Sequence, residues 1–76
     1  MARMILSVPD ISCEHCERTI ENALQPLEGI HSVAVDIPSH EVTVVFDESR
    51  MNVGRIKKVL LDEEYPVAAV EQGPAQ

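Results

Sequence analysis

The chain has only two cysteines, Cys13 and Cys16, and they stand three positions apart. They follow a short apolar run at Met4–Val8 and open a helical pattern that reaches Leu24. At the start of a helix, both sulfurs lie near backbone N–H groups and the positive end of the helix dipole, and both effects favour the thiolate. Two neighbouring thiolates can bind a soft metal ion or cycle through a disulfide.

The shortage of further ligands favours Cu(I) over other metals. Cu(I) is soft and accepts two thiolates in near-linear coordination, so Cys13 and Cys16 suffice. Zn(II) takes about four ligands, and within one chain only His15, Glu14 or Asp10 could supplement the sulfurs. Zn(II), Cd(II), Hg(II) and Ag(I) remain alternatives. His15 is either a third ligand or an exposed residue that assists metal transfer.

A small thiol-disulfide redox protein is the alternative from a different class. A thioredoxin-like protein needs a longer chain and another strand order, and usually has Trp and Pro about its motif. This chain has no tryptophan, and no proline stands between the cysteines. We find no nucleophile with a base and an orienting group, so we do not expect an enzyme.

The length, composition and charge of the chain argue against several classes of protein. A chain of 76 residues with 45% hydrophobic residues predicts one folded domain with a core, and one Phe and one Tyr make that core aliphatic. The net charge of −7 argues against nucleic-acid binding. No apolar stretch approaches the roughly 20 residues of a membrane helix. We expect a cytoplasmic protein, where paired cysteines are more often metal-binding or catalytic than structural.

The hydrophobic pattern predicts six elements in the order strand, helix, strand, strand, helix, strand. The expected elements are a strand at Met4–Val8, a helix from the cysteine segment to about Gln25, strands at His31–Ile37 and Glu41–Phe46, a helix after the N-cap residue Asn52, and a last strand at Tyr65–Val70. Pro66 near the start of the last strand favours an edge position. Residues 72–76 read as a frayed tail.

This order predicts an α+β fold of the ferredoxin-like βαββαβ type, with two helices on one face of a four-stranded antiparallel sheet. A single domain would span residues 1–76, with its core at about 4–70. In this arrangement the first strand-to-helix loop lies near the loop before the last strand. We therefore expect Cys13 and Cys16 to be exposed at that rim, with Tyr65 close by.

The chain resembles the heavy-metal-associated domains, the fold of copper chaperones and of N-terminal modules of metal-exporting P-type ATPases. The likeness covers about residues 4–70 and rests on Ser12–Cys16, on Leu27–Val33 and on Glu64-Tyr65 within the same element order. It implies a soluble metallochaperone that passes its metal to partner thiolates through shared, three-coordinate intermediates. The implied partner is a metal-exporting P-type ATPase or a metal-responsive regulator. The expected state is a monomer, with a metal-bridged dimer as a possible form.

The chain departs from the family motif Gly-Met-Thr-Cys-x-x-Cys at three positions. Asp10, Ile11 and Ser12 replace the first three residues. Ile11 can still fill the apolar pocket beneath the site, and Ser12 keeps a hydroxyl that can cap the helix. Glu64 stands where the family often has glycine, so a left-handed conformation is expected there.

Other residues with metal-binding side chains are expected to have no part in the site. His31 and His40 fall on the predicted hairpin and read as surface residues. The methionines at positions 1, 4 and 51 are too scattered for a thioether copper site, and Met4 reads as a core residue.

Overall fold

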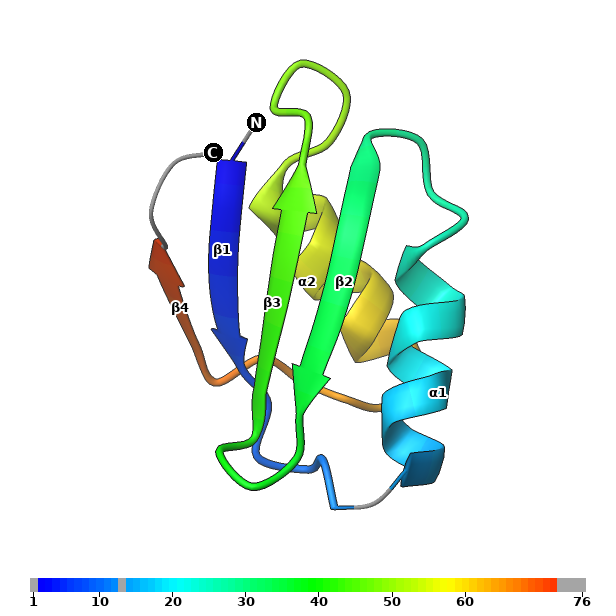
Figure 1. Cartoon of the computed structure of the whole chain (residues 1–76), viewed down its shortest axis with the longest axis vertical. Helices are drawn as coiled ribbons and strands as arrows, with labels where there is room; N and C mark the ends of the chain where they lie inside the picture. The colour runs from blue at the N-terminus through cyan, green and yellow to red at the C-terminus, as the bar shows by residue number, and fades with distance from the viewer. Residues whose placement is uncertain (1, 13, 73–76) are drawn as a thin grey trace.

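The computed structural model describes residues 2–12 and 14–72 and confirms the predicted order of elements (Figure 1). The elements in this part of the chain are β1 (Ala2–Ser7), α1 (Glu14–Leu24), β2 (Ile30–Asp36), β3 (Glu41–Phe46), α2 (Val53–Asp62) and β4 (Ala69–Gln72). None of the helices formed by these residues has the length and apolar character of a membrane span.

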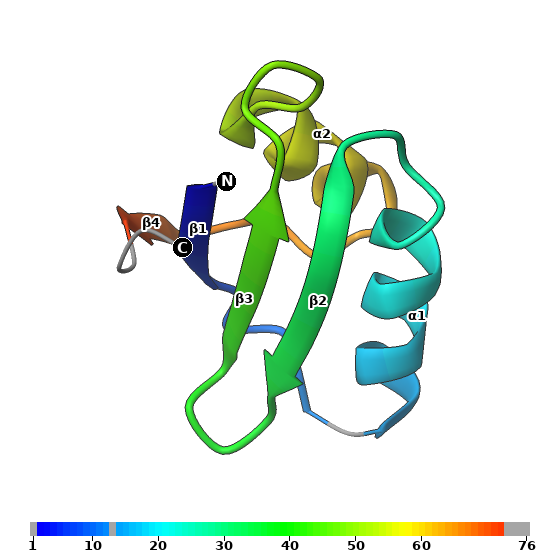
Figure 2. The same ribbon diagram turned by 45° about the horizontal axis from the view of Figure 1, so that its top comes forward.

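The strands form one antiparallel sheet in the order β2-β3-β1-β4, and both helices cover the same face of it (Figure 2). This is the ferredoxin-like sandwich that the sequence predicts. Burial alternates along β3, where Val42, Val44 and Phe46 are buried and the residues between them are partly exposed. The alternation follows from the two-residue period of a strand, which turns every second side chain toward the helices.

The last strand is an edge strand, as expected, but its predicted bounds are wrong. β4 begins at Ala69 rather than Tyr65 and continues through Gln72, which pairs with Met4. The backbone N–H of Ala68 donates to the carbonyl of Ser7 at 2.8 Å, where the connection from α2 reaches the end of β1. Only from Ala69 onward does the chain run beside β1. Residues 73–76 of the expected tail lie outside the described residues.

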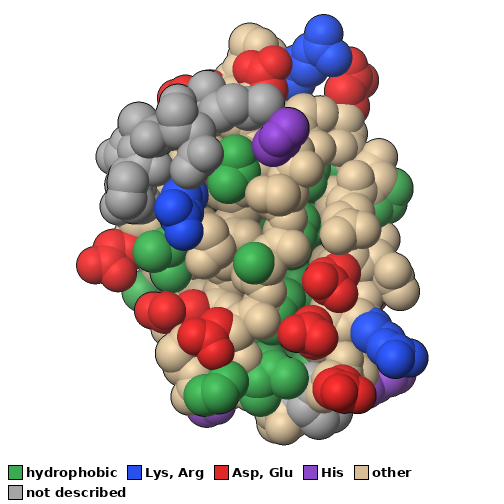
Figure 3. Space-filling model, viewed as in Figure 1, with side chains coloured by type: hydrophobic (Ala, Val, Ile, Leu, Met, Phe, Trp, Pro, Cys, Tyr) green, Lys and Arg blue, Asp and Glu red, His purple; other side chains and the backbone are tan. Residues whose placement is uncertain are grey.

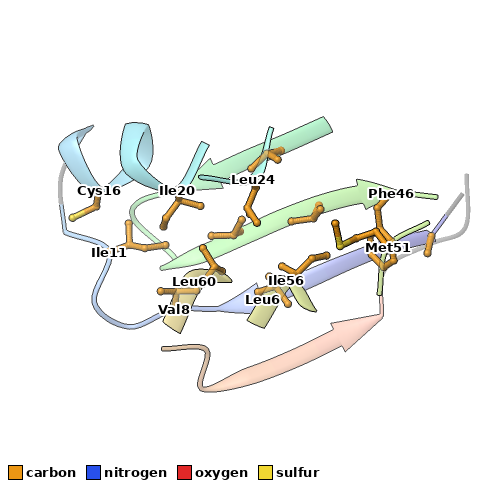
Figure 4. Close-up of a cluster of buried hydrophobic side chains, with 14 residues drawn as sticks. Leu6, Val8, Ile11, Cys16, Ile20, Leu24, Phe46, Met51, Ile56 and Leu60 are labelled. Carbon is orange, nitrogen blue, oxygen red and sulfur yellow. The ribbon is translucent and has the colours of Figure 1, made fainter. Parts of the chain in front are cut away.

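The core is mainly aliphatic, with Phe46, Met51 and Cys16 as its other members, and lies between the sheet and the two helices (Figure 4). The fully buried large side chains are Phe46, Leu6, Ile11, Ile20, Leu24, Ile56, Leu60, Val8, Val42 and Val44. Met4 packs against this core but is only partly buried. Helix α1 ends at Leu24, two residues before Pro26, as proline sterics predict.

Helix α2 begins and ends with recognisable caps. The side chain of Asn52 accepts a hydrogen bond from the backbone N–H of Arg55 at 2.8 Å, which confirms the predicted N-cap. Glu64 has a φ of 68°, so the expected left-handed conformation is confirmed. The N–H groups of Glu64 and Tyr65 donate to the carbonyls of Leu61 (3.0 Å) and Leu60 (2.8 Å). This is a Schellman cap formed without glycine.

Candidate metal site

The loop between β1 and α1 is held by backbone hydrogen bonds and by one buried side chain. The N–H of Val8 donates to the carbonyl of His40 in the β2–β3 turn at 2.8 Å, and the N–H of Ile11 donates to the carbonyl of Val8 at 3.2 Å. Ile11 is fully buried, which confirms that it fills the apolar space beneath the loop. The loop therefore enters α1 from a fixed position.

Cys16 lies in the first turn of α1 and is only 7% exposed. The expectation of an exposed rim cysteine is wrong for this residue. Cys16, Ile20 and Leu24 are spaced four residues apart, so they share the face of α1 that is turned toward the sheet. Figure 4 shows Cys16 at one end of the buried cluster, near Ile11 and Ile20. Cys13 lies outside the described residues, so its exposure and its role remain predictions.

Two oxygen atoms from the loop lie at sulfur contact distance from Cys16. The thiol donates to the carbonyl oxygen of Asp10 at 3.9 Å, and the Ser12 hydroxyl lies 3.9 Å from the same sulfur. The sequence predicts Ser12 as a helix cap and offers Asp10 as a further ligand. The contact of the Asp10 carbonyl with Cys16 could not be predicted, because no side-chain pattern signals a backbone acceptor.

His15 is exposed on the first turn of α1, and its backbone carbonyl accepts a hydrogen bond from the Thr19 hydroxyl at 2.9 Å. Within residues 2–12 and 14–72, no three His, Cys, Asp or Glu side chains are grouped so that they could hold a metal ion. The described residues therefore do not supply a ready-made site for an ion that needs several hard or borderline ligands. Ligation by His15 stays a prediction.

The other residues considered from the sequence divide into packed and exposed groups. Tyr65 is partly buried and packs against the core cluster to which Cys16 belongs, while its approach to the metal site remains a prediction. His31 and His40 are exposed, which confirms them as surface residues.

Two acidic side chains lie in the same helical turn as Cys16. Glu14 and Glu17 occupy the first turn of α1, where the helix dipole stabilises negative charge. Figure 3 shows further Asp and Glu side chains over the lower part of the open sheet face. This field attracts cations and repels anions. A soft sulfur beside acidic side chains is a setting that attracts cations more than anions.

Comparison with known proteins gives consistent matches. The model of the heavy-metal-associated domain matches residues 5–66. The copper chaperone CopZ of Staphylococcus haemolyticus is 36% identical over 67 residues, which are 88% of this chain and 98% of the relative. A solved CopZ metallochaperone superposes with a TM-score of 0.84 at 33% identity, covering 87% of this chain and 98% of that one. Oxidized MerP from Ralstonia metallidurans gives 0.84 at 31% identity, covering 92% and 96%.

Proposed function

Because this chain belongs to the heavy-metal-associated domain family, we propose that it is a metallochaperone that binds Cu(I) through Cys13 and Cys16. The observation that carries the proposal is the place of Cys16 at the first turn of α1, with its sulfur held at the end of the loop. The relatives named as copper chaperones support copper as the cargo.

The donor set supports a soft ion of low coordination number. Two thiolates satisfy Cu(I), whereas Zn(II) needs about four ligands. Among the described residues, which do not include Cys13, no three His, Cys, Asp or Glu side chains are grouped together. The same low coordination number suits hand-over, because an incoming thiolate can join the ion before another leaves.

Metal binding changes the bonding of Cys16. The thiol donates to the Asp10 carbonyl, and this bond is lost when the sulfur gives up its proton to bind the ion. The Ser12 hydroxyl can then donate to the thiolate, since it already lies 3.9 Å from the sulfur. The loop can thus form a hydrogen bond with Cys16 in its protonated form and in its metal-bound form, with little rearrangement.

The proposed partner is a thiol-bearing acceptor, namely a metal-exporting P-type ATPase or a metal-responsive regulator. We propose that the protein is a monomer and that it works in the cytoplasm. The cytoplasm is a reducing compartment, which keeps both thiols available. A metal-bridged dimer would form when two chains share one ion. Transfer by ligand exchange needs no catalytic group of the chaperone itself.

Competition between metals tests this function. The reduced chain is titrated with Cu(I) and with Zn(II) against chelators of known affinity, and Cys13→Ser and Cys16→Ser are measured beside it. We expect tight Cu(I) binding at one equivalent, much weaker Zn(II) binding, and loss of Cu(I) binding in both variants. Preferential Zn(II) binding would identify a Zn(II) carrier. A chain that retains no metal by mass, and whose two thiols are oxidised to a disulfide by dissolved oxygen, would identify a redox protein.

A further inference from the structure

A pocket of about 180 Å³ lies at the end of the molecule opposite the β1–α1 loop. It is formed where β1 begins, β3 ends and α2 begins, as Figure 1 shows for the three elements. Met4 and Met51 both line it, together with Phe46, Glu48 and Val53. The structure thus brings together two thioether side chains that are far apart in the sequence. The methionines are expected from the sequence to be too scattered for a thioether copper site, but the fold places Met4 and Met51 at one pocket.

The backbone fixes both methionines at the pocket. In the β1–β3 register Met4 is paired with Val44, which is buried beneath the helices, so Met4 lies on the covered face of the sheet. Met51 is 3% exposed, and Figure 4 shows it beside Phe46, at the far end of the cluster from Cys16. Met4 is only partly buried, so the pocket keeps a route to solvent.

Two neutral sulfurs in one pocket select for particular ions. Thioethers are soft ligands that favour Cu(I) and similar monovalent ions over hard cations such as Mg²⁺. Glu48 is exposed at the same pocket and can offset the single positive charge of such an ion. Methionine is also a common filler of irregular core gaps. A filler role predicts no response of these side chains to a soft metal, so the two readings can be separated.

We infer that Met4 and Met51 form a second, weaker site for Cu(I) or Ag(I), in which both thioether sulfurs bind the ion and Glu48 balances its charge. The inference is independent of the proposed cysteine site, because it concerns other side chains at the other end of the fold.

The test uses the full chain labelled with ¹³C at the methionine methyl groups. Ag(I) is added beyond the amount that saturates the cysteines, and the methyl signals are followed by NMR. We expect the Met4 and Met51 signals to shift together along one binding curve. Met4→Leu and Met51→Leu keep the side-chain volume, and each should weaken the response of the remaining methionine about tenfold or more, since one of two soft ligands is lost.

Two controls make the outcome specific. Val70→Ile changes an exposed side chain of β4 outside this pocket and should leave the binding curve unchanged, and Mg²⁺ should move neither signal. If Met51→Leu does not fold, the Met4→Leu variant alone tests the inference. Met4 is only partly buried, so its replacement should disturb the fold less. The inference is overturned if neither methyl signal moves with excess Ag(I), or if one methionine responds unchanged after the other is replaced. Loss of silver binding at the cysteines would count against the proposed function only.

Discussion

The carbonyl oxygen of His40 accepts a 2.8 Å hydrogen bond from the backbone N–H of Val8, which connects the β2–β3 turn to the loop that leads to the proposed metal site. His40 presents this carbonyl from a left-handed backbone with a φ of 57°. The geometry of the turn therefore influences the geometry of the site loop, although His40 itself is not a predicted ligand.

We expect His40→Val to destabilise the protein, because a β-branched residue is poorly tolerated in a left-handed conformation. The cost should be about 1–2 kcal/mol. His40→Asn is the matched control and should be nearly neutral, since asparagine adopts this conformation readily. Chemical denaturation measures both, and amide exchange at Val8 should quicken in the valine variant only. Equal stability of the two variants would contradict the expectation.

Glu64→Gly should be neutral or stabilising, although glycine adds backbone entropy to the unfolded chain. A non-glycine residue at the left-handed position costs about 1 kcal/mol, and glycine removes that cost. Glu64→Ala serves as the control, because it removes the acidic side chain at the helix end without relieving the backbone. We expect the melting temperature of the glycine variant to exceed that of the alanine variant. The reverse order would show that the left-handed backbone carries no cost.

Cys16→Ser should lower the free energy of unfolding by about 1–3 kcal/mol, because it places a hydroxyl where a nearly buried sulfur packs against the core. Cys16→Ala, which buries no polar group, is the control and should cost less in stability while losing Cu(I) equally. Denaturation of the metal-free proteins and competition with a Cu(I) chelator give the two readouts. Retention of Cu(I) by the alanine variant would refute the assignment of Cys16 as a ligand.

His15→Ala should leave Cu(I) affinity within about tenfold, roughly 1.4 kcal/mol, because two thiolates already satisfy that ion. Zn(II) affinity should fall further, since Zn(II) gains more from a third ligand. Both metals are measured with this variant and with the unchanged chain. A Cu(I) loss far larger than the Zn(II) loss would make His15 a copper ligand.

The side-chain and backbone hydrogen bonds from Ser49 lower the pKa of Asp47 below its usual value of 3.8. Because the folded-state pKa is depressed, the ionised carboxylate contributes stability that is present above pH 3.8 and is lost as the pH falls through the folded pKa. We expect Ser49→Ala to raise the pKa of Asp47, measured by NMR titration of its carboxyl. Titration of Glu48 in both proteins is the control. An unchanged Asp47 value would refute the assignment to Ser49.

The residues that the sequence placed correctly are those whose side chains follow the period of one element. Alternation along Glu41–Phe46 gave the bounds of β3 and its buried face, and Asn52 marked the start of α2. The four-residue spacing of Cys16 and Ile20 carried the same kind of signal for burial. The expectation of an exposed Cys16 followed instead from the position of the motif in a loop, and the structure shows that it is wrong.

The remaining differences depend on contacts between distant parts of the chain. β4 begins where the connection from α2 reaches Ser7, and its start is set by that approach rather than by its own sequence. Met4 and Met51 line one pocket because of the register of β1 on β3 and the position where α2 begins. Neither relationship leaves a local pattern in the sequence.

The burial of Cys16 links the proposed metal site to the integrity of the core. A proposed ligand that belongs to the core is held in place only while the core is intact, so a partly unfolded chain would present an incomplete site. Metal binding in turn favours the folded state in proportion to the logarithm of the free metal concentration over the dissociation constant. Loaded chains should therefore resist proteolysis and turnover longer than empty ones, which would couple the lifetime of the carrier in the cell to the supply of the metal.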